Sequence, residues 1–244
     1  WVASDTGITL TVTNPATEAL AGAVHLASAA QVLQACHAAA KAQRAWRKTP
    51  AIGRADFMRR LADALVARKH AIGAALALES GKSLEDATNE AAYAADITRY
   101  HAEWARRIEG EVIPSDSPSE NLVLHREPLG VVACLIPFNY PVYTLLRKIA
   151  PALITGNTVV VRPSNNTPCS AFEIAQAVLD AGLPPGVVNI MAMDHDAAEQ
   201  MCTHPRVAMI TLTGSVAAGR RMLDFSKTNI ARVSLEMGGK TPAI

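Results

Sequence analysis

The feature that most constrains the fold of this sequence is an alternation of short apolar runs and helical patterns from Gly130 onward. The runs are apolar at consecutive positions, which is typical of strands buried on both faces of a parallel sheet. Helical patterns separate them, as crossovers between parallel strands require. We expect strands at 131–136, 158–161, 187–191, 207–212 and 232–235, and helices at 142–153, 168–181, 196–202 and 216–225. The sequence therefore predicts an α/β fold with helices on both faces of a parallel sheet.

The part of the chain before this sheet is mostly helical in pattern. Across residues 28–109, apolar side chains recur at helical spacing, as at Phe57, Leu61 and Leu65. A strand at 8–13 is expected ahead of this helical segment. We assign residues 1–110 as an N-terminal strand and helical part of the same domain as the sheet.

Residues 111–129 differ from the segments on either side. Two short extended pieces, 111–113 and 122–124, flank a turn rich in proline and serine, which predicts a hairpin. Both edges of such a hairpin would be exposed and able to pair with another chain. We therefore expect residues 111–129 to form an arm, with residues 130–244 forming the sheet.

Composition and charge exclude several classes of function. Half of the residues are hydrophobic and 18% are charged, as in soluble globular proteins. A net charge of +1 provides no field for binding nucleic acid or an anionic membrane surface. The longest apolar run, 131–136, is too short to span a bilayer, and residues 1–5 do not resemble a signal peptide. The four cysteines lack the spacing of a metal site or a disulfide framework, so we expect a cytoplasmic protein without a metal.

Four short motifs lie where expected strands end. They are Pro-Phe-Asn-Tyr-Pro at 137–141, Val-Arg-Pro-Ser at 161–164, Leu-Thr-Gly-Ser at 212–215 and Leu-Glu-Met-Gly-Gly-Lys at 235–240. Ligands of open α/β sheets bind beyond the carboxyl ends of the strands. A purely structural use of Pro, Gly and Asn would place them equally at both ends. The motifs therefore predict one binding crevice at that edge.

Two of these motifs contain groups suited to acid–base or oxyanion chemistry. Asn139 is bracketed by Pro137 and Pro141, and a rigidly held amide can donate to an oxygen that becomes negative during a reaction. The alternative is an asparagine that bonds backbone groups within a turn. Glu236 would act as a general base if a partly apolar cleft raised its pKa. The alternative for Glu236 is an ordinary turn residue.

The other two motifs contain groups suited to phosphate. Arg162 ends a strand and can bond phosphate or ribose hydroxyls, although it could also cap a surface loop. Thr213, Gly214 and Ser215 join a strand to a helix, whose N-terminus suits a pyrophosphate. Ser215 is equally a routine N-cap, and the two roles are compatible. Gly219, one turn further, would permit close helix–strand packing.

Taken together and in this order, the four motifs resemble those of the aldehyde dehydrogenase superfamily, in its N-terminal cofactor-binding portion. The resemblance extends from Asn14 to Ile244 and implies a Rossmann-like sheet with an oligomerisation arm. It implies NAD(P)-dependent oxidation of an aldehyde to a carboxylic acid through a cysteine thioester, in a homo-oligomer (dimer or tetramer). Asn139 would stabilise the oxyanion and Glu236 would activate the water that cleaves the thioester. We expect the nucleophilic cysteine and the catalytic domain to lie beyond this chain.

The resemblance also implies which residues contact NAD or NADP. They are Ile136, Pro137, Phe138, Arg162, Ser164, Asn165, Thr213, Gly214, Ser215, Met237 and Gly238. The family usually has lysine at position 162 and often glutamate at position 165, where this chain has Arg162 and Asn165. Without that acid the cofactor is either NAD or NADP, with a preference toward NADP. The segment 191–199 lacks the family's usual glycines, which puts the shape of the adenine pocket in doubt.

Two alternatives remain beside an active dehydrogenase. The chain could be a truncated protein that binds dinucleotide without turning over aldehyde, or a structural or interaction protein that retains the fold. None of the chain's own cysteines is expected to be a nucleophile, because Cys36 and Cys134 lie in apolar patterns and Cys169 and Cys202 lack a basic partner. Arg147 could face the substrate tunnel or be ordinary surface charge.

Overall fold

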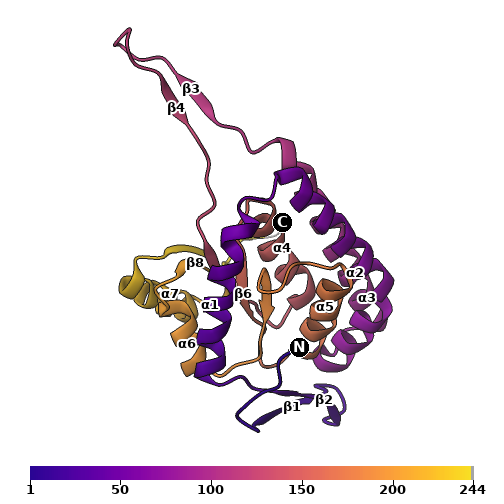
Figure 1. Ribbon diagram of the computed structural model, residues 1–244. Helices are drawn as coiled ribbons and strands as arrows, with labels where there is room; N and C mark the ends of the chain where they lie inside the picture. The colour runs from indigo at the N-terminus through magenta and orange to yellow at the C-terminus, as the bar shows by residue number, and fades with distance from the viewer. Residues whose placement is uncertain (243–244) are drawn as a thin grey trace.

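A five-stranded parallel sheet forms the centre of the computed structural model, which describes residues 1–242 (Figure 1). The strands lie in the order β7-β6-β5-β8-β9. β5 is the first of these five strands in the sequence but lies at the centre of the sheet. The chain adds β6 and β7 on one side of β5 and then β8 and β9 on the other, which puts a switch point between β5 and β8. The strands are β5 (Val131–Leu135), β6 (Thr158–Arg162), β7 (Val188–Ile190), β8 (Val207–Gly214) and β9 (Arg232–Met237). The predicted α/β fold is confirmed.

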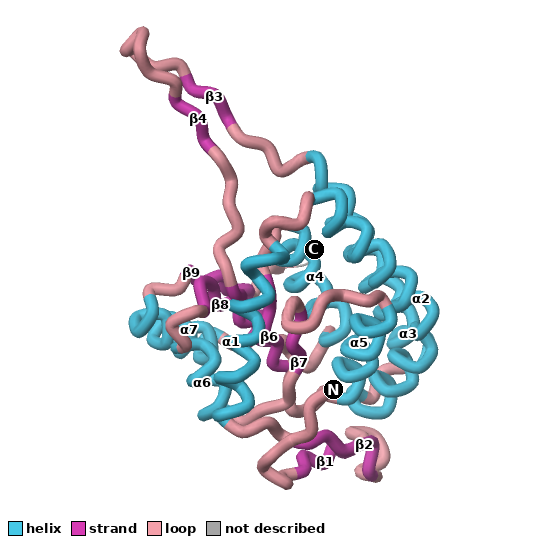
Figure 2. The backbone as a smooth tube through the Cα atoms, viewed as in Figure 1, coloured by secondary structure: helices cyan, strands magenta, loops and turns pink. Residues whose placement is uncertain are grey.

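Helices cover both faces of the sheet (Figure 2). α4 and α5 pack on one face with α2 and α3 outside them, and α1, α6 and α7 pack on the other. Alternate β5 residues therefore enter different cores, with Val132 and Cys134 in one and Val131 and Ala133 in the other. The first core contains residues of α2 (Ala51–Ser80), α3 (Leu84–Ala102), α4 (Pro141–Ile154) and α5 (Cys169–Asp180). The second contains residues of α1 (Ala29–Trp46), α6 (His195–Thr203) and α7 (Val216–Asn229).

The N-terminal region contains a strand that the sequence did not indicate. β1 (Thr9–Thr13) was expected, but it pairs with β2 (Leu20–His25) in an antiparallel ribbon. The sequence of β2 is Leu-Ala-Gly-Ala-Val-His, which has few β-branched or aromatic residues. Its pairing with β1, rather than its own propensity, makes it a strand.

The predicted hairpin is confirmed and projects away from the body of the molecule (Figures 1 and 2). After α3 and a short 3-10 turn (Glu103–Arg106), β3 (Glu111–Ile113) pairs antiparallel with β4 (Leu122–Leu124). Every residue of both strands is exposed. No helix that the structure describes combines the length and apolarity needed to cross a bilayer.

Two strands continue further than the apolar pattern indicated. β8 runs to Gly214 and β9 to Met237, with Thr213 opposite Glu236 and Gly214 opposite Met237. We expected these residues in turns beyond the strands, and that expectation was wrong. Backbone hydrogen bonds between β8 and β9 extend the ladder regardless of side-chain polarity.

Candidate functional site

The register of the sheet brings the four motifs to one edge. Leu135 of β5 lies opposite both Arg162 of β6 and Leu212 of β8, and Thr213 lies opposite Glu236 of β9. The strands are parallel, so the loops that follow them all leave from the carboxyl edge. The N–H of Ile136 also donates to the carbonyl of Arg162 at 3.0 Å, which joins the first two loops directly. We call this edge, with the residues of the four motifs, the carboxyl rim.

Asn139 lies in the loop between β5 and α4. It is exposed, and none of the side-chain hydrogen bonds among the described residues involves it. An asparagine that served the turn would bond nearby backbone groups, as Asn14 does with the N–H groups of Ala16 and Thr17. The Asn139 amide is therefore available to a group outside the described chain.

Arg162 is the last residue of β6 and is only partly exposed. Its Nε donates to the carbonyl of Met193, 3.3 Å away, in the loop after β7. Burial lowers the pKa of Arg162, and the nearby Cys202 and Asp194 act in the opposite direction. The guanidinium remains a cation because its ordinary pKa is so high. Arg162 therefore places a half-buried positive charge between the carboxyl ends of β6 and β7.

The loop after β6 holds two further residues of the predicted cofactor set. The Ser164 hydroxyl accepts the N–H of Asn166 at 3.2 Å and so maintains the turn. The side-chain oxygen of Asn165 is buried and has no hydrogen-bond partner in the described part of the chain. Buried polar atoms are nearly always bonded, so an unpaired one at this rim is a candidate ligand contact.

The start of α7 is open to solvent. Ser215 is its N-cap, and the Ser215 hydroxyl accepts the N–H of Ala218 at 3.1 Å. Thr213, just before it, has a buried hydroxyl without a partner among residues 1–242. A Cβ added to Gly219 would overlap the sulfur of Met237, so the predicted close packing at Gly219 is confirmed. This close approach fixes the helix N-terminus beside the end of β9.

Glu236 lines a partly apolar depression, as the sequence indicated, but it is not buried there. Its carboxylate is about half exposed and pairs with the Arg147 guanidinium of α4, with Oε1 and Nη2 2.9 Å apart. Beside this pair, the Lys148 ammonium donates to the Thr211 hydroxyl at 2.9 Å, and burial lowers the pKa of Lys148. Glu236 stays half exposed because the covering of the sheet is incomplete. Helix α4 packs over β5 and β6, whereas this face of β8 and β9 borders the depression, whose volume is about 440 Å³.

Two buried glutamates beside the rim were not predicted. Glu79 and Glu90 are almost inaccessible to solvent, and each accepts two backbone N–H groups at the start of another helix. A sequence signal existed for Glu90, because it lies among Ala87, Ala91 and Ala94 in the apolar stripe of α3. A charged residue on a buried stripe requires a partner.

The four cysteines are unsuited to nucleophilic attack, as expected. Burial raises the pKa of Cys36 to about 11 and the pKa values of Cys134, Cys169 and Cys202 to about 12. Because the thiolate is the reactive form, these thiols are inert near neutral pH.

Comparison with known protein families identifies the family of this chain. The profile of the aldehyde dehydrogenase family matches residues 1–244. The chain belongs to the aldehyde dehydrogenase family. It is 42% identical over 234 residues to the lactaldehyde dehydrogenase of Escherichia coli K12, covering 96% of this chain and 49% of that protein. This member of the family therefore spans about half the length of the curated relatives it matches.

Solved structures of other aldehyde dehydrogenases have the same fold. The crystal structure of Escherichia coli lactaldehyde dehydrogenase matches with a TM-score of 0.96 and 40% identity, over 99% of this chain and 51% of that one. An NADP-dependent glyceraldehyde-3-phosphate dehydrogenase from Bacillus halodurans C-125, complexed with NADP, matches with a TM-score of 0.92 and 36% identity. That match covers 98% of this chain and 51% of the other.

Proposed function

We propose that this chain is the cofactor-binding portion of an enzyme that oxidises an aldehyde to a carboxylic acid with NAD or NADP. The observation that carries the proposal is the convergence of Asn139, Arg162, Ser215 and Glu236 on one carboxyl rim at the switch point of the sheet. Family membership and the names of the relatives support the same reaction.

The residues at the rim fit a dinucleotide. The open N-terminus of α7 at Ser215 offers N–H groups and a positive dipole end to a pyrophosphate. Asn165 and Thr213 carry buried oxygen atoms without partners in the described chain, and Arg162 adds a cation. Since position 165 is not acidic, nothing there would repel a 2′-phosphate, and we infer that NADP is accepted. The bound nicotinamide would accept a hydride from the substrate carbon.

Asn139 and Glu236 take different roles in the proposed reaction. A cysteine thiolate from outside this chain adds to the aldehyde carbonyl, and the Asn139 amide donates a hydrogen bond to the resulting oxyanion. After hydride loss leaves a thioester, Glu236 removes a proton from the water that cleaves it. In this structure Oε1 of Glu236 is paired with Arg147, so this oxygen reaches the water only after the ion pair breaks.

We further propose that the protein is a homo-oligomer joined through the projecting hairpin. A two-stranded hairpin is at best marginally stable alone in water. The exposed apolar side chains of Val112, Ile113 and Leu122 to Leu124 would be covered by another copy of the chain.

The test uses the full-length protein that contains this chain. Reduced nicotinamide should form from an aldehyde with NAD or NADP, and Asn139→Ala should lower kcat by about 100- to 1000-fold. Cofactor affinity should be nearly unchanged, because the amide acts on the oxyanion. Asn89→Ala, on the exposed side of α3, is the matched control.

Other outcomes identify the alternatives. Thermal stabilisation by NAD or NADP without any aldehyde-dependent reduction would indicate a dinucleotide-binding protein without turnover. Absence of stabilisation at saturating cofactor, in a folded full-length protein, would indicate a structural role.

A further inference from the structure

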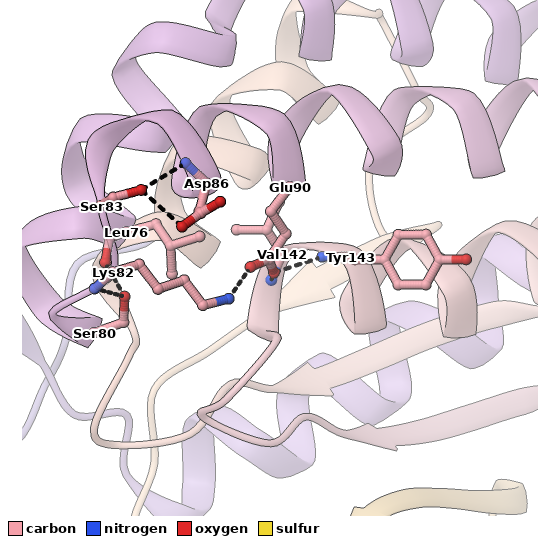
Figure 3. Close-up of polar contacts among 8 residues, drawn as sticks. All are labelled: Leu76, Ser80, Lys82, Ser83, Asp86, Glu90, Val142 and Tyr143. Atoms are coloured by element: carbon pink, nitrogen blue, oxygen red, sulfur yellow. Dashed lines mark hydrogen bonds and ion pairs between the residues drawn. The ribbon is translucent and has the colours of Figure 1, made fainter. Parts of the chain in front are cut away.

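Helix α4, which begins directly after the Asn139 loop, lacks a cap of its own. Its N-cap residue is Tyr140, whose side chain makes no capping hydrogen bond, and Pro141 has no N–H. The N–H groups of Val142 and Tyr143 instead donate to Oε1 of Glu90 on α3, at 2.8 and 3.1 Å (Figure 3). The first turn of α4 is therefore held by a carboxylate from another helix.

The surroundings of Glu90 compensate the cost of burying its charge. The residue is fully buried, and its second oxygen accepts a hydrogen bond from the Lys82 ammonium, which points at the carboxylate in Figure 3. The positive end of the α4 dipole also favours a carboxylate at this place. A buried carboxylate with three donors is satisfied, whereas removal of any one would leave an unpaired polar group.

Lys82 links this cap to the residue that follows Asn139. Its ammonium lies 4.3 Å from the centroid of the Tyr140 ring, a cation–π contact. The backbone of Lys82 is fixed in a short connection, since Gly81 ends α2 in a left-handed conformation (φ 76°) and Ser83 caps α3. Lys82 therefore binds the carboxylate and the aromatic ring from one rigid position.

We propose that Glu90 and Lys82 are positioning residues for Asn139. Capping by Glu90 sets the start of α4, Lys82 holds Tyr140, and together they orient the loop from Ile136 to Pro141. The inference rests on the proposed function for its effect on turnover. Its structural part, that Glu90 orders the start of α4, is independent of that function.

A second buried glutamate provides a matched control. Glu79, at the end of α2, accepts the N–H groups of Cys169 and Ser170 at the start of α5, at 2.6 and 3.0 Å. The loop before α5 follows Arg162 and contains Asn165, both of which we assign to the cofactor, whereas the loop before α4 contains the oxyanion donor. Each glutamate thus caps a helix by accepting two backbone N–H groups, but the two adjoin different parts of the proposed site.

The experiment compares Glu90→Gln with Glu79→Gln in the full-length protein. Glutamine keeps an acceptor oxygen and the shape of the side chain but loses the charge that holds Lys82. We expect Glu90→Gln to lower kcat by about 10- to 100-fold, as misplacement of a catalytic group does, with the KM for cofactor within about twofold. Glu79→Gln should raise the KM for cofactor more than it lowers kcat. Hydrogen exchange measured by mass spectrometry should become faster in peptides covering 136–145 in Glu90→Gln only.

A double-mutant cycle separates positioning from general destabilisation. If Glu90 acts through Asn139, Glu90→Gln should have little further effect on kcat in an Asn139→Ala background. A loss of equal size in both backgrounds, an unchanged kcat, or unchanged exchange over 136–145 would each overturn the proposal. If the wild-type protein oxidises no aldehyde, the proposed function fails, while the exchange experiment still decides whether Glu90 orders the start of α4.

Discussion

The N–H groups at the starts of α4 and α5 are bonded to glutamates from other helices rather than to neighbouring Ser, Thr or Asp side chains. Glu90 lies 52 residues from Val142, and Glu79 lies 91 residues from Ser170. Local capping patterns describe partners within three or four residues, so they could not predict these bonds. The motif residues at the rim were predictable because each one stands beside its own strand in the sequence. Their partners, such as Arg147 for Glu236, depend on how helices pack.

Glu79 also makes stability depend on pH. Burial raises the pKa of Glu79 above its ordinary value of 4.5, and hydrogen bonds from Ser170 and Cys169 oppose that rise. The folded state therefore binds more protons than the unfolded state as pH rises above 4.5, so the free energy of unfolding decreases through this interval. Glu79→Gln removes this contribution.

Urea unfolding at a series of pH values measures the effect. We expect the free energy of unfolding of the wild type, relative to Glu79→Gln, to fall as pH increases from about 4.5 toward neutrality. Glu199→Gln, on the exposed side of α6, controls for the loss of one charge. If the free energy of unfolding of the wild type, relative to Glu79→Gln, stayed constant or grew with pH, the raised pKa of Glu79 would be contradicted.

At the scale of elements, the sequence predicted every strand of the central sheet and the arm, because continuous apolar runs have few other uses. It could not predict the order β7-β6-β5-β8-β9, since periodicity identifies a buried face but not the neighbour that covers it. β2 was missed because its propensity is weak, and the ends of β8 and β9 were placed early because their last residues are polar or glycine.

Close packing of α2 against α3 depends on Gly73. A Cβ at this position would lie 2.8 Å from the Cα of Thr88, a backbone atom that cannot move without shifting α3. Gly73→Ala should therefore lower the free energy of unfolding by about 1–3 kcal/mol, although alanine alone would favour the helix by about 1 kcal/mol.

Chemical denaturation tests this prediction against a second glycine of the same helix. A Cβ at Gly53 meets only the side-chain methyl of Thr49, at 3.2 Å, which can turn away. Gly53→Ala should thus be near neutral or slightly stabilising. Equal effects of the two substitutions would show that close helix packing at Gly73 is not the cause.

The whole molecule combines a sheet whose strands β5 and β6 are well buried with two features that face outward. One is the depression beside Glu236, which polar and apolar side chains line together, and the other is the arm formed by β3 and β4. Neither has a covering layer in the described chain. The sequence indicated the arm, whose composition differs from its surroundings, and a partly apolar cleft at Glu236. It did not indicate the extent of the depression, which arises from the position of α4 over only part of the sheet.

Charged substitutions on the arm should dissociate the proposed homo-oligomer. Val112 and Val123 lie directly opposite each other, so Val112→Lys with Val123→Glu keeps an attractive cross-strand pair while removing the apolar surface. We expect a smaller particle mass by light scattering and an unchanged mass for Leu223→Lys with Leu179→Glu, on exposed helix positions. An unchanged mass for the arm variant would exclude the arm from the interface.

The exposed arm also has a consequence for how the protein is made. Its strands lie near the middle of this sequence, so a ribosome releases them before β5 to β9 exist. Until the second subunit of the proposed homo-oligomer binds, the newly synthesised polypeptide exposes unpaired, apolar strand edges to other nascent chains nearby. Yield in a producing cell should consequently be governed by chaperone supply and by the local concentration of sister chains more than by the strength of the folded core.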